Sequence, residues 1–196
     1  MLVGLAFATT VAQAPSARAA PPRGAVRVEI VTSKGTIVID VDTTNAPVTG
    51  KNFLRYVDGH LFDGGSFFRT VRADNQPTDP VRIAVIQGGA PRGPQAPKDF
   101  PPIPLEWTRA TGIHHVDGTV SMARNTPNSA TSSFFICVGD QPELDFGGRR
   151  NPDGQGFGAF GHVVSGMDVV RAIWSAPATG QSLAPPVVIE RVRRAS

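Results

Sequence analysis

The sequence predicts a mainly β fold, either an antiparallel barrel or a sandwich, with helices covering its ends. Three features favour this class. Apolar residues alternate with polar ones in about eight short segments, two further segments have helical spacing, and no repeated strand–helix–strand order connects them. The length of 196 residues allows one domain with short appendages.

Residues 1–19 carry most features of a signal peptide, although no Lys or Arg precedes the apolar run. Residues 2–12 are apolar but too few to span a bilayer, and Ala17-Arg18-Ala19 has the small residues that signal peptidase requires. Ala-Pro-Pro follows and would interrupt a buried helix continuing into the domain, which is the alternative interpretation of this stretch. We expect a cleaved leader over residues 1–19, a short linker over 20–25 and one folded domain over 26–194.

The folded domain is predicted to begin with an antiparallel hairpin. Two runs alternate between apolar and polar residues on either side of Ser33-Lys34-Gly35, a sequence typical of a turn. The residues expected on one face are Val26, Val28, Ile30, Ile37, Ile39 and Val41.

Two helices are expected. The first begins near Pro47, which suits a first helical turn, behind the polar stretch 43–45 that offers a capping side chain, and it ends at Gly59. The second covers residues 166–175, where apolar residues recur on one side. These apolar residues are Met167, Val170, Ile173 and Trp174.

Six more strands complete the predicted β content. Their residues are rich in β-branched and aromatic types and are bounded by Gly, Pro and Asn. Polar or Gly- and Pro-rich loops separate several of them, at residues 72–80, 88–104 and 145–158. The expected strands are 66–71, 81–86, 118–122, 134–138, 160–164 and 187–192.

The composition argues against several classes of partner. The formal net charge of +3 arises from 19 basic and 16 acidic residues without a basic cluster, so we expect no nucleic-acid partner. After the leader, no apolar stretch is long enough for stable membrane insertion. The single cysteine, Cys137, lies in an apolar run and is expected to be a buried, unreactive thiol.

The sequence lacks motifs for phosphate, metal or nucleophilic chemistry. Glycine pairs such as Gly147-Gly148 do not have the strand–loop–helix context of a phosphate loop. His114 and His115 are adjacent, so on a strand they would face opposite ways, and no third ligand stands at metal spacing. No Gly-x-Ser-x-Gly elbow of a hydrolase occurs. We therefore expect neither a metal nor a cofactor.

Arg69 is unusual because it is a charge within an aromatic strand. Alternation places Phe67 and Arg69 on one face of that strand and Phe68 on the other, while Val85 and Gln87 share a face of the next strand. An arginine among aromatic residues must reach solvent or find partners. A structural ion pair is the simplest interpretation of Arg69 from the pattern alone.

Five segments together resemble the cyclophilins, a family of peptidyl-prolyl cis-trans isomerases. Each segment is weak alone, but their order and spacing match the family from about Val26 to Val192, and the leader makes the bacterial exported members the most similar. The segments are Ser66-Phe67-Phe68-Arg69, Val85-Ile86-Gln87-Gly88-Gly89, Gly118-Thr119-Val120-Ser121-Met122-Ala123-Arg124, Pro127-Asn128-Ser129-Ala130 with Ser133-Phe134-Phe135-Ile136, and Phe160-Gly161-His162-Val163 with Gly166-Met167.

The resemblance implies a closed eight-stranded antiparallel barrel capped by two α-helices, with an isomerase domain over residues 26–194. It implies that Arg69 is catalytic, that Gln87 helps to hold it, and that Phe135 belongs to the catalytic pocket. The main-chain groups of Ala123 and Arg124 would meet an extended peptide. The implied substrate-binding residues are Phe68, Val85, Met122, Ala123, Arg124, Ser133, Leu144 and Phe157.

The implied activity is rotation about X-Pro bonds in proline-containing peptides and in unfolded or partly folded exported proteins, in the periplasm or outside the cell. Amide resonance gives this rotation a barrier of about 18–20 kcal/mol. An arginine N–H directed at the prolyl nitrogen would stabilise the twisted state, and arginine suits this role because it stays protonated.

Four positions depart from the common family pattern. Ser133 replaces a longer glutamine, and Glu143 replaces a tryptophan that commonly contributes to cyclosporin binding, so we expect weak inhibition by cyclosporin. Phe157 lies near the place of a pocket histidine, and Ala84 near that of a bulkier aromatic residue. The changes at Ser133 and Glu143 favour an alternative function, a non-catalytic proline-peptide-binding module or a holding chaperone.

Overall fold

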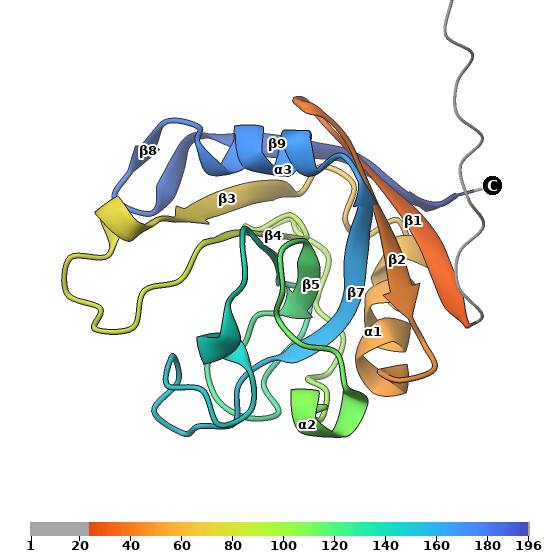
Figure 1. The fold of residues 1–196 in the computed structure, drawn as a ribbon. Coiled ribbons are helices and arrows are strands. Elements are labelled where there is room, and N and C mark those ends of the chain that lie inside the picture. The colour runs from red at the N-terminus through yellow and green to blue at the C-terminus, as the bar shows by residue number, and fades with distance from the viewer. Residues whose placement is uncertain (1–23, 196) are drawn as a thin grey trace, which may run out of the picture.

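The computed structural model describes residues 24–195 as a mainly β protein (Figure 1). The predicted leader over residues 1–19 lies outside the described residues. The strands are β1 (Ala25–Thr32), β2 (Gly35–Asp42), β3 (Ser66–Val71), β4 (Val85–Gly89), β5 (Thr119–Met122), β6 (Phe134–Cys137), β7 (Gly158–Ser165), β8 (Ala178–Thr179) and β9 (Ser182–Arg194).

Eight of these strands form a closed antiparallel barrel. Their order is β1-β2-β7-β5-β6-β4-β3-β9, and β9 pairs back with β1 to complete the ring. The short β8 lies beyond the ring and is hydrogen-bonded to β9. The eight-stranded barrel is therefore confirmed, and the alternative of an open sandwich is excluded.

Within residues 24–195, three α-helices accompany the barrel. They are α1 (Pro47–Asp58), α2 (Thr108–Thr111) and α3 (Met167–Trp174). Helix α1 packs against β7 and β9, and α3 packs against β2 and β3 (Figure 1). The sequence predicts α1 and α3 but not α2, because four residues are too few to show a helical period.

The N-terminus of α1 is capped from a distant part of the chain. A local polar cap is predicted, but Ala46 occupies the cap position and its side chain makes no hydrogen bond. The carboxylate of Glu106 instead accepts hydrogen bonds from the main-chain N–H groups of Val48 at 3.1 Å and Thr49 at 2.7 Å. A carboxylate suits this place because the N-terminal end of the helix dipole is positive. The prediction is wrong because Glu106 is remote in sequence from the helix it caps.

Aromatic side chains fill the interior of the barrel. Phe53 of α1 meets Phe62, Phe134 and Phe160, and Tyr56 meets Phe62, with ring centroids 5.0–5.4 Å apart. All five are almost fully buried. Because each aromatic side chain removes about 150–250 Å² from water, this cluster makes a large contribution to folding.

Two strands, β4 and β9, differ most from their predicted boundaries. Strand β4 begins at Val85 rather than at residue 81, because the side chain of Gln76 takes the main-chain hydrogen bonds of Ile83. Strand β9 spans Ser182–Arg194 and pairs with β8, whereas the sequence predicts only residues 187–192. Adjacent prolines conceal the first half of β9, since proline is depleted in strands.

A β-bulge interrupts β3 between Phe67 and Arg69. Phe67 pairs with Gly88 and Arg69 pairs with the adjacent Gln87, so Phe68 is the extra residue. The prediction that Phe67 and Arg69 share a face is therefore wrong. Phe67 packs into the barrel core, and Arg69 lies on the opposite side of the sheet.

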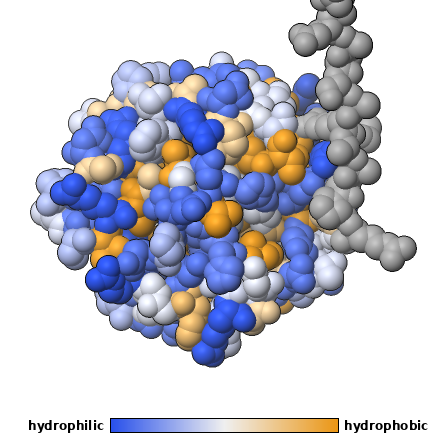
Figure 2. All heavy atoms as spheres, in the orientation of Figure 1, coloured by the Kyte–Doolittle hydropathy of each residue, from blue (hydrophilic) through white to orange (hydrophobic). Residues whose placement is uncertain are grey.

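The face shown in Figure 2 is mixed, with small apolar areas set among polar residues. None of the helices in residues 24–195 has the length and apolar character needed to cross a membrane. Cys137 is fully buried in β6, and burial raises the pKa of its thiol. The expectation of a buried cysteine is confirmed, and its lack of reactivity stays a prediction that the raised pKa supports.

Candidate active site

A groove of about 530 Å³ lies on the outer face of β3, β4 and β6. The strands supply its floor, and its walls come from three loop regions, residues 90–99, 123–133 and 144–157. The long Gly- and Pro-rich loop after β4 thus lies against the barrel, as the sequence predicts, and forms one wall.

Arg69 lies on the floor of the groove and is held by two glutamines. Its Nη1 donates to Oε1 of Gln87 at 2.9 Å, across the β3–β4 pair. Its Nε and Nη2 donate to Oε1 of Gln181 at 2.9 Å and 2.5 Å. Of the five N–H groups of a guanidinium, these bonds use three, so one N–H on each Nη atom remains for a ligand.

Gln181 is a partner that sequence reasoning missed. It lies in the turn between β8 and β9, 112 positions from Arg69 along the chain. Its amide N–H donates to the main-chain carbonyl of Asn75 at 3.2 Å, which fixes the side chain. A lone glutamine beside a glycine carries no periodic signal, and its role becomes visible only when β9 is placed beside β3.

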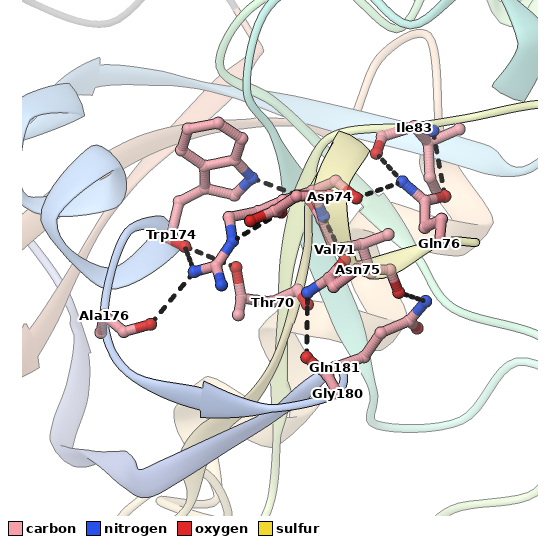
Figure 3. A network of polar contacts seen from close by, with 11 residues as sticks. Thr70, Val71, Asp74, Asn75, Gln76, Ile83, Trp174, Ala176, Gly180 and Gln181 are labelled. Atoms are coloured by element: carbon pink, nitrogen blue, oxygen red, sulfur yellow. Dashed lines mark hydrogen bonds and ion pairs between the residues drawn. The ribbon is translucent and has the colours of Figure 1, made fainter.

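The polar loop between β3 and β4 supports this arrangement (Figure 3). Gln76 is almost fully buried, and its amide bridges the loop by donating to the carbonyls of Arg72 at 2.8 Å and Ile83 at 2.7 Å. The amide of Asn75 donates to the carbonyl of Gly180 at 3.1 Å. The loop therefore fixes the β8–β9 turn that carries the second glutamine.

The charge of Arg69 is not neutralised by an acid. Both side-chain acceptors are neutral amides, and no carboxylate within residues 24–195 pairs with it, so the ion-pair interpretation is wrong. Burial lowers the pKa of Arg69, the charge of Arg150 lowers it further, and Asp79 acts in the opposite direction. The guanidinium still stays protonated, because arginine does not deprotonate in proteins. The groove therefore holds an oriented positive charge.

An apolar pocket adjoins this charge. Phe135, Val85 and Leu144 belong to a buried cluster separate from the barrel core, and Phe157 packs against it. The rings of Phe135 and Phe157 meet edge to face, with centroids 5.3 Å apart and planes at 88°. Phe135 pairs with Gln87 across β4 and β6, so the apolar surface lies next to the residues that orient the arginine.

A buried polar group supports Phe135 from behind. The ring of His115 stacks on it with centroids 5.8 Å apart and planes at 16°. Nδ1 of His115 lies 2.6 Å from Oδ1 of Asp145, and Nε2 lies 2.9 Å from Oγ of Ser121. These groups have the order of a hydrolase triad, but Ser121 is fully buried and its Oγ is out of reach of a substrate. The group therefore holds the Phe135 ring in place.

The two adjacent histidines converge on one carboxylate. Nδ1 of His114 lies 2.9 Å from the second oxygen of Asp145. The expectation that the histidines face opposite ways on a strand is wrong, because residues 112–118 form a loop. Burial raises the pKa of Asp145, but hydrogen bonds from His115 and His114 outweigh it and the pKa is lowered. Among the described residues, no group of three His, Cys, Asp or Glu side chains is placed to hold a metal.

The structure gathers most of the residues singled out from the sequence. Phe68 and Met122 do not line the groove: Met122 is buried in the barrel core, and the ring of Phe68 lies 4.2 Å from the guanidinium of Arg92. Their roles in binding stay predictions. The predicted residues that line the groove are Arg69, Val85, Gln87, Ala123, Arg124, Ser133, Phe135, Leu144 and Phe157.

Two of the outer positions have defined partners. The main-chain N–H of Ala123 donates to the carbonyl of Ser133 at 2.9 Å, so this N–H is already used within the protein. The side chain of Arg124 binds both oxygens of Asp153 at 2.7 and 2.8 Å and closes one end of the groove. Glu143 pairs with Arg149 at 2.7 Å and does not line the groove.

The closed barrel carries a groove with an oriented arginine beside an apolar pocket, and comparisons identify the family. A family model for cyclophilin type peptidyl-prolyl cis-trans isomerases matches residues 27–194. Peptidyl-prolyl cis-trans isomerase cyp18 of Streptomyces antibioticus is 36% identical over 173 residues, which cover 85% of this chain and 96% of that protein. Peptidyl-prolyl cis-trans isomerase B of Escherichia coli K12 is 36% identical over 152 residues, or 77% and 85% of the two chains. This chain belongs to the cyclophilin family and is a peptidyl-prolyl cis-trans isomerase.

Solved structures agree on the fold. A crystal structure of a Cryptosporidium parvum cyclophilin type peptidyl-prolyl cis-trans isomerase matches with a TM-score of 0.71 at 19% identity, over 88% of this chain and 98% of the other. A structure of the same protein in the presence of the dipeptide Ala-Pro gives a TM-score of 0.70 at 20% identity, over 87% and 99%. The cyclophilin-like barrel expected from the sequence is confirmed.

Proposed function

We propose that the groove receives the proline of an X-Pro bond and that Arg69 promotes rotation about that bond. The observation that carries this proposal is the setting of Arg69. Neutral amides fix the guanidinium without neutralising it, and they leave an N–H on each Nη atom beside an apolar pocket. A carboxylate partner would instead have neutralised the charge of the guanidinium.

Catalysis of rotation about an X-Pro bond requires only a proline pocket and a hydrogen-bond donor directed at the prolyl nitrogen. Rotation is slow because amide resonance creates a barrier of about 18–20 kcal/mol. In the twisted state the prolyl nitrogen loses its conjugation and its lone pair can accept a hydrogen bond. An N–H of Arg69 directed at that nitrogen stabilises the twisted state more than the planar one, which lowers the barrier. No covalent bond is broken, so no nucleophile or proton transfer is required.

The neighbouring residues complete the site. Phe135, Leu144 and Phe157 offer carbon surface to the proline ring and keep water away from Arg69, which strengthens its electrostatic interaction. Gln87 uses its Oε1 to hold Arg69, so its amide N–H groups can donate to a carbonyl of the substrate. One residue therefore orients both the catalytic group and the peptide.

The physiological substrates we propose are unfolded or partly folded exported proteins, in the periplasm or outside the cell. The support is the sequence of residues 1–19, with an apolar core of signal-peptide length before Ala17-Arg18-Ala19. Intact-mass analysis of protein recovered from an exporting cell tests this. We expect loss of residues 1–19; an unprocessed cytosolic product would overturn the localisation.

A protease-coupled assay on an Ala-Pro peptide tests the role of Arg69. Removing one preorganised donor from an active site commonly lowers kcat by about 10²–10³-fold, and we expect a loss of this order for Arg69→Ala. Wild-type activity equal to that of Arg69→Ala would refute the role. Peptide binding that survives in Arg69→Ala, with no turnover by either protein, would support the holding-chaperone alternative.

A further inference from the structure

A second arginine, Arg92, is held in place in the wall of the groove. Arg92 lies in the loop after β4 and lines the groove together with Ser133. Its guanidinium lies 4.2 Å from the centroid of the Phe68 ring, and its Nη2 donates to Oγ of Ser133 at 2.9 Å. Stacking and a hydrogen bond together restrict an otherwise flexible side chain, so the charge occupies a defined position.

The residues around this contact explain why an arginine fits there. Ser133 is shorter than the glutamine that many cyclophilins carry at the same position. Gly89 lies beside it, and a Cβ on that glycine would come within 3.2 Å of both Cα and Oγ of Ser133. Gly89 and Ser133 are therefore closely packed, and the short side chain of Ser133 ends in a hydroxyl that Nη2 of Arg92 reaches. A charged group thus contacts the residue that stands where many cyclophilins have glutamine.

The other arginines at the rim of the groove differ from Arg92 because each forms an ion pair with a carboxylate. Arg124 pairs with Asp153 at 2.7 Å, and Arg150 pairs with Asp79 at 3.3 Å. No carboxylate within residues 24–195 lies at ion-pair distance from Arg92. Of these three rim arginines, Arg92 is therefore the one whose charge is available to a substrate.

One carboxylate among the described lining residues, Asp99, lies in the same part of the groove. Its Oδ2 accepts a hydrogen bond from Oγ1 of Thr131 at 2.9 Å, and its Oδ1 accepts one from the hydroxyl of Tyr56 at 3.3 Å. Asp99 is thus tied to the protein by two hydroxyl groups. Arg92 makes one such bond through one Nη atom and keeps its other donors.

The strand register indicates which part of a peptide would reach Arg92. Ser133 stands two positions before Phe135, and its carbonyl pairs with Ala123, so the β5–β6 ladder continues to it. Residues two apart on a strand share a face and are separated by about 7 Å. A peptide in extended form also advances about 7 Å in two residues. In a peptide that runs along β6 with its proline against Phe135, a side chain two residues from the proline would lie beside Arg92.

We propose that Arg92 gives this isomerase a preference for substrates with an aspartate or glutamate two residues from the proline. The inference rests on the proposed role of the groove in binding proline. An acidic side chain there would pair with an already oriented guanidinium, whereas a lysine would meet a like charge. The site is exposed, and exposed ion pairs change an equilibrium by about two- to fivefold.

Peptides with Glu, Gln or Lys two residues before or two residues after the proline, assayed by NMR exchange, test the proposal. We expect kcat/KM for the Glu peptide to exceed that for the Lys peptide by about two- to fivefold at one of these positions. The ratio should approach one in Arg92→Gln, reverse in Arg92→Glu, and diminish in the wild type as salt is added. The ratio of kcat/KM for the Glu peptide to that for the Lys peptide is compared because a general loss of activity in a variant lowers both values equally.

Arg109→Gln is the matched control. Arg109 is also an exposed arginine stacked on an aromatic ring, 3.9 Å from the centroid of Phe146, but it does not line the groove. The Arg109→Gln variant removes one positive charge, as Arg92→Gln does. We expect it to leave the ratio of kcat/KM for the Glu peptide to that for the Lys peptide unchanged. An equal effect of Arg92→Gln and Arg109→Gln would overturn the proposal, since net charge alone would then explain the preference.

The remaining outcomes are also decisive. The role of Arg92 is overturned if the wild type shows a Glu-to-Lys ratio of kcat/KM near one both before and after the proline. It is also overturned if Arg92→Gln leaves that ratio unchanged. A preference for Lys overturns it as well and indicates Asp99 as the determinant. Failure of the groove itself is distinguishable, because wild-type activity would then be insensitive to Arg69→Ala, whereas failure of this inference alone leaves the dependence on Arg69 intact.

Discussion

Replacing Gln181 with alanine tests whether the orientation of Arg69 matters for catalysis. The change removes one oxygen that accepts hydrogen bonds from Nε at 2.9 Å and from Nη2 at 2.5 Å, and leaves Gln87 as the remaining side-chain partner. Hydrogen bonds to charged groups contribute about 1.5–3 kcal/mol each. Because Arg69 is half-buried and water can replace the lost oxygen, we expect the free energy of unfolding to fall by only about 1 kcal/mol.

Turnover should suffer more than stability. A guanidinium held through Nη1 alone can swing about that contact, and a misplacement of about 1 Å can cost about 10²-fold in rate. We expect kcat/KM of Gln181→Ala to fall by about 10- to 100-fold. The change in KM should be smaller, because Gln181 does not line the groove that would bind the peptide.

Gln181→Glu separates orientation from charge. A carboxylate would keep an acceptor for Nε and Nη2 but would neutralise Arg69, so we expect an ordered arginine and poor turnover. The protease-coupled assay should be run beside thermal unfolding of each variant. The reasoning is refuted if Gln181→Ala stays within twofold of the wild type, or if Gln181→Glu is fully active.

Three further predictions follow from single contacts. Phe135→Ala should lower the free energy of unfolding by about 3–5 kcal/mol, because it empties the space between His115 and Phe157; a loss under 1 kcal/mol in urea unfolding would contradict this packing. Glu106→Ala should cost about 0.5–2 kcal/mol by uncapping α1, with unfolding of Glu106→Gln showing how much depends on charge. The lowered pKa of Asp145 means that it stabilises the fold above its ordinary pKa of about 3.9, and this stability is lost as pH falls through the lowered value. Asp145→Asn should therefore weaken the dependence of unfolding on pH in the acid range, and an unchanged dependence would count against the histidine contacts.

The sequence predicts the elements whose signals are local. The hairpin of β1 and β2 forms with the predicted residues, because strand alternation and a turn are both contained in one segment. The pairing of Arg69 with Gln87 is also expected, since the two family segments carrying them form neighbouring strands. Cys137 is buried, as its apolar neighbours indicate.

The missed features all depend on contacts between distant segments. Glu106 caps α1 from a loop, and Gln181 reaches Arg69 from the β8–β9 turn. The bulge at Phe68 inserts one residue against a partner strand, and this is not visible in the alternation of β3 alone. Each feature requires knowing which strands or loops meet, and a periodic pattern does not contain that information.

The groove is built partly from barrel strands, which hold its residues in fixed positions, and partly from loops, where residues can be substituted more freely. Arg69 pairs with Gln87, and Gln87 pairs with Phe135, so three neighbouring strands carry these residues side by side. None of the three can move without breaking the ladders of a closed barrel. Arg92 and Ser133 lie outside the strands, at the rim. A substitution at the rim can therefore change which peptides are preferred without displacing the arginine and pocket that act on the prolyl bond.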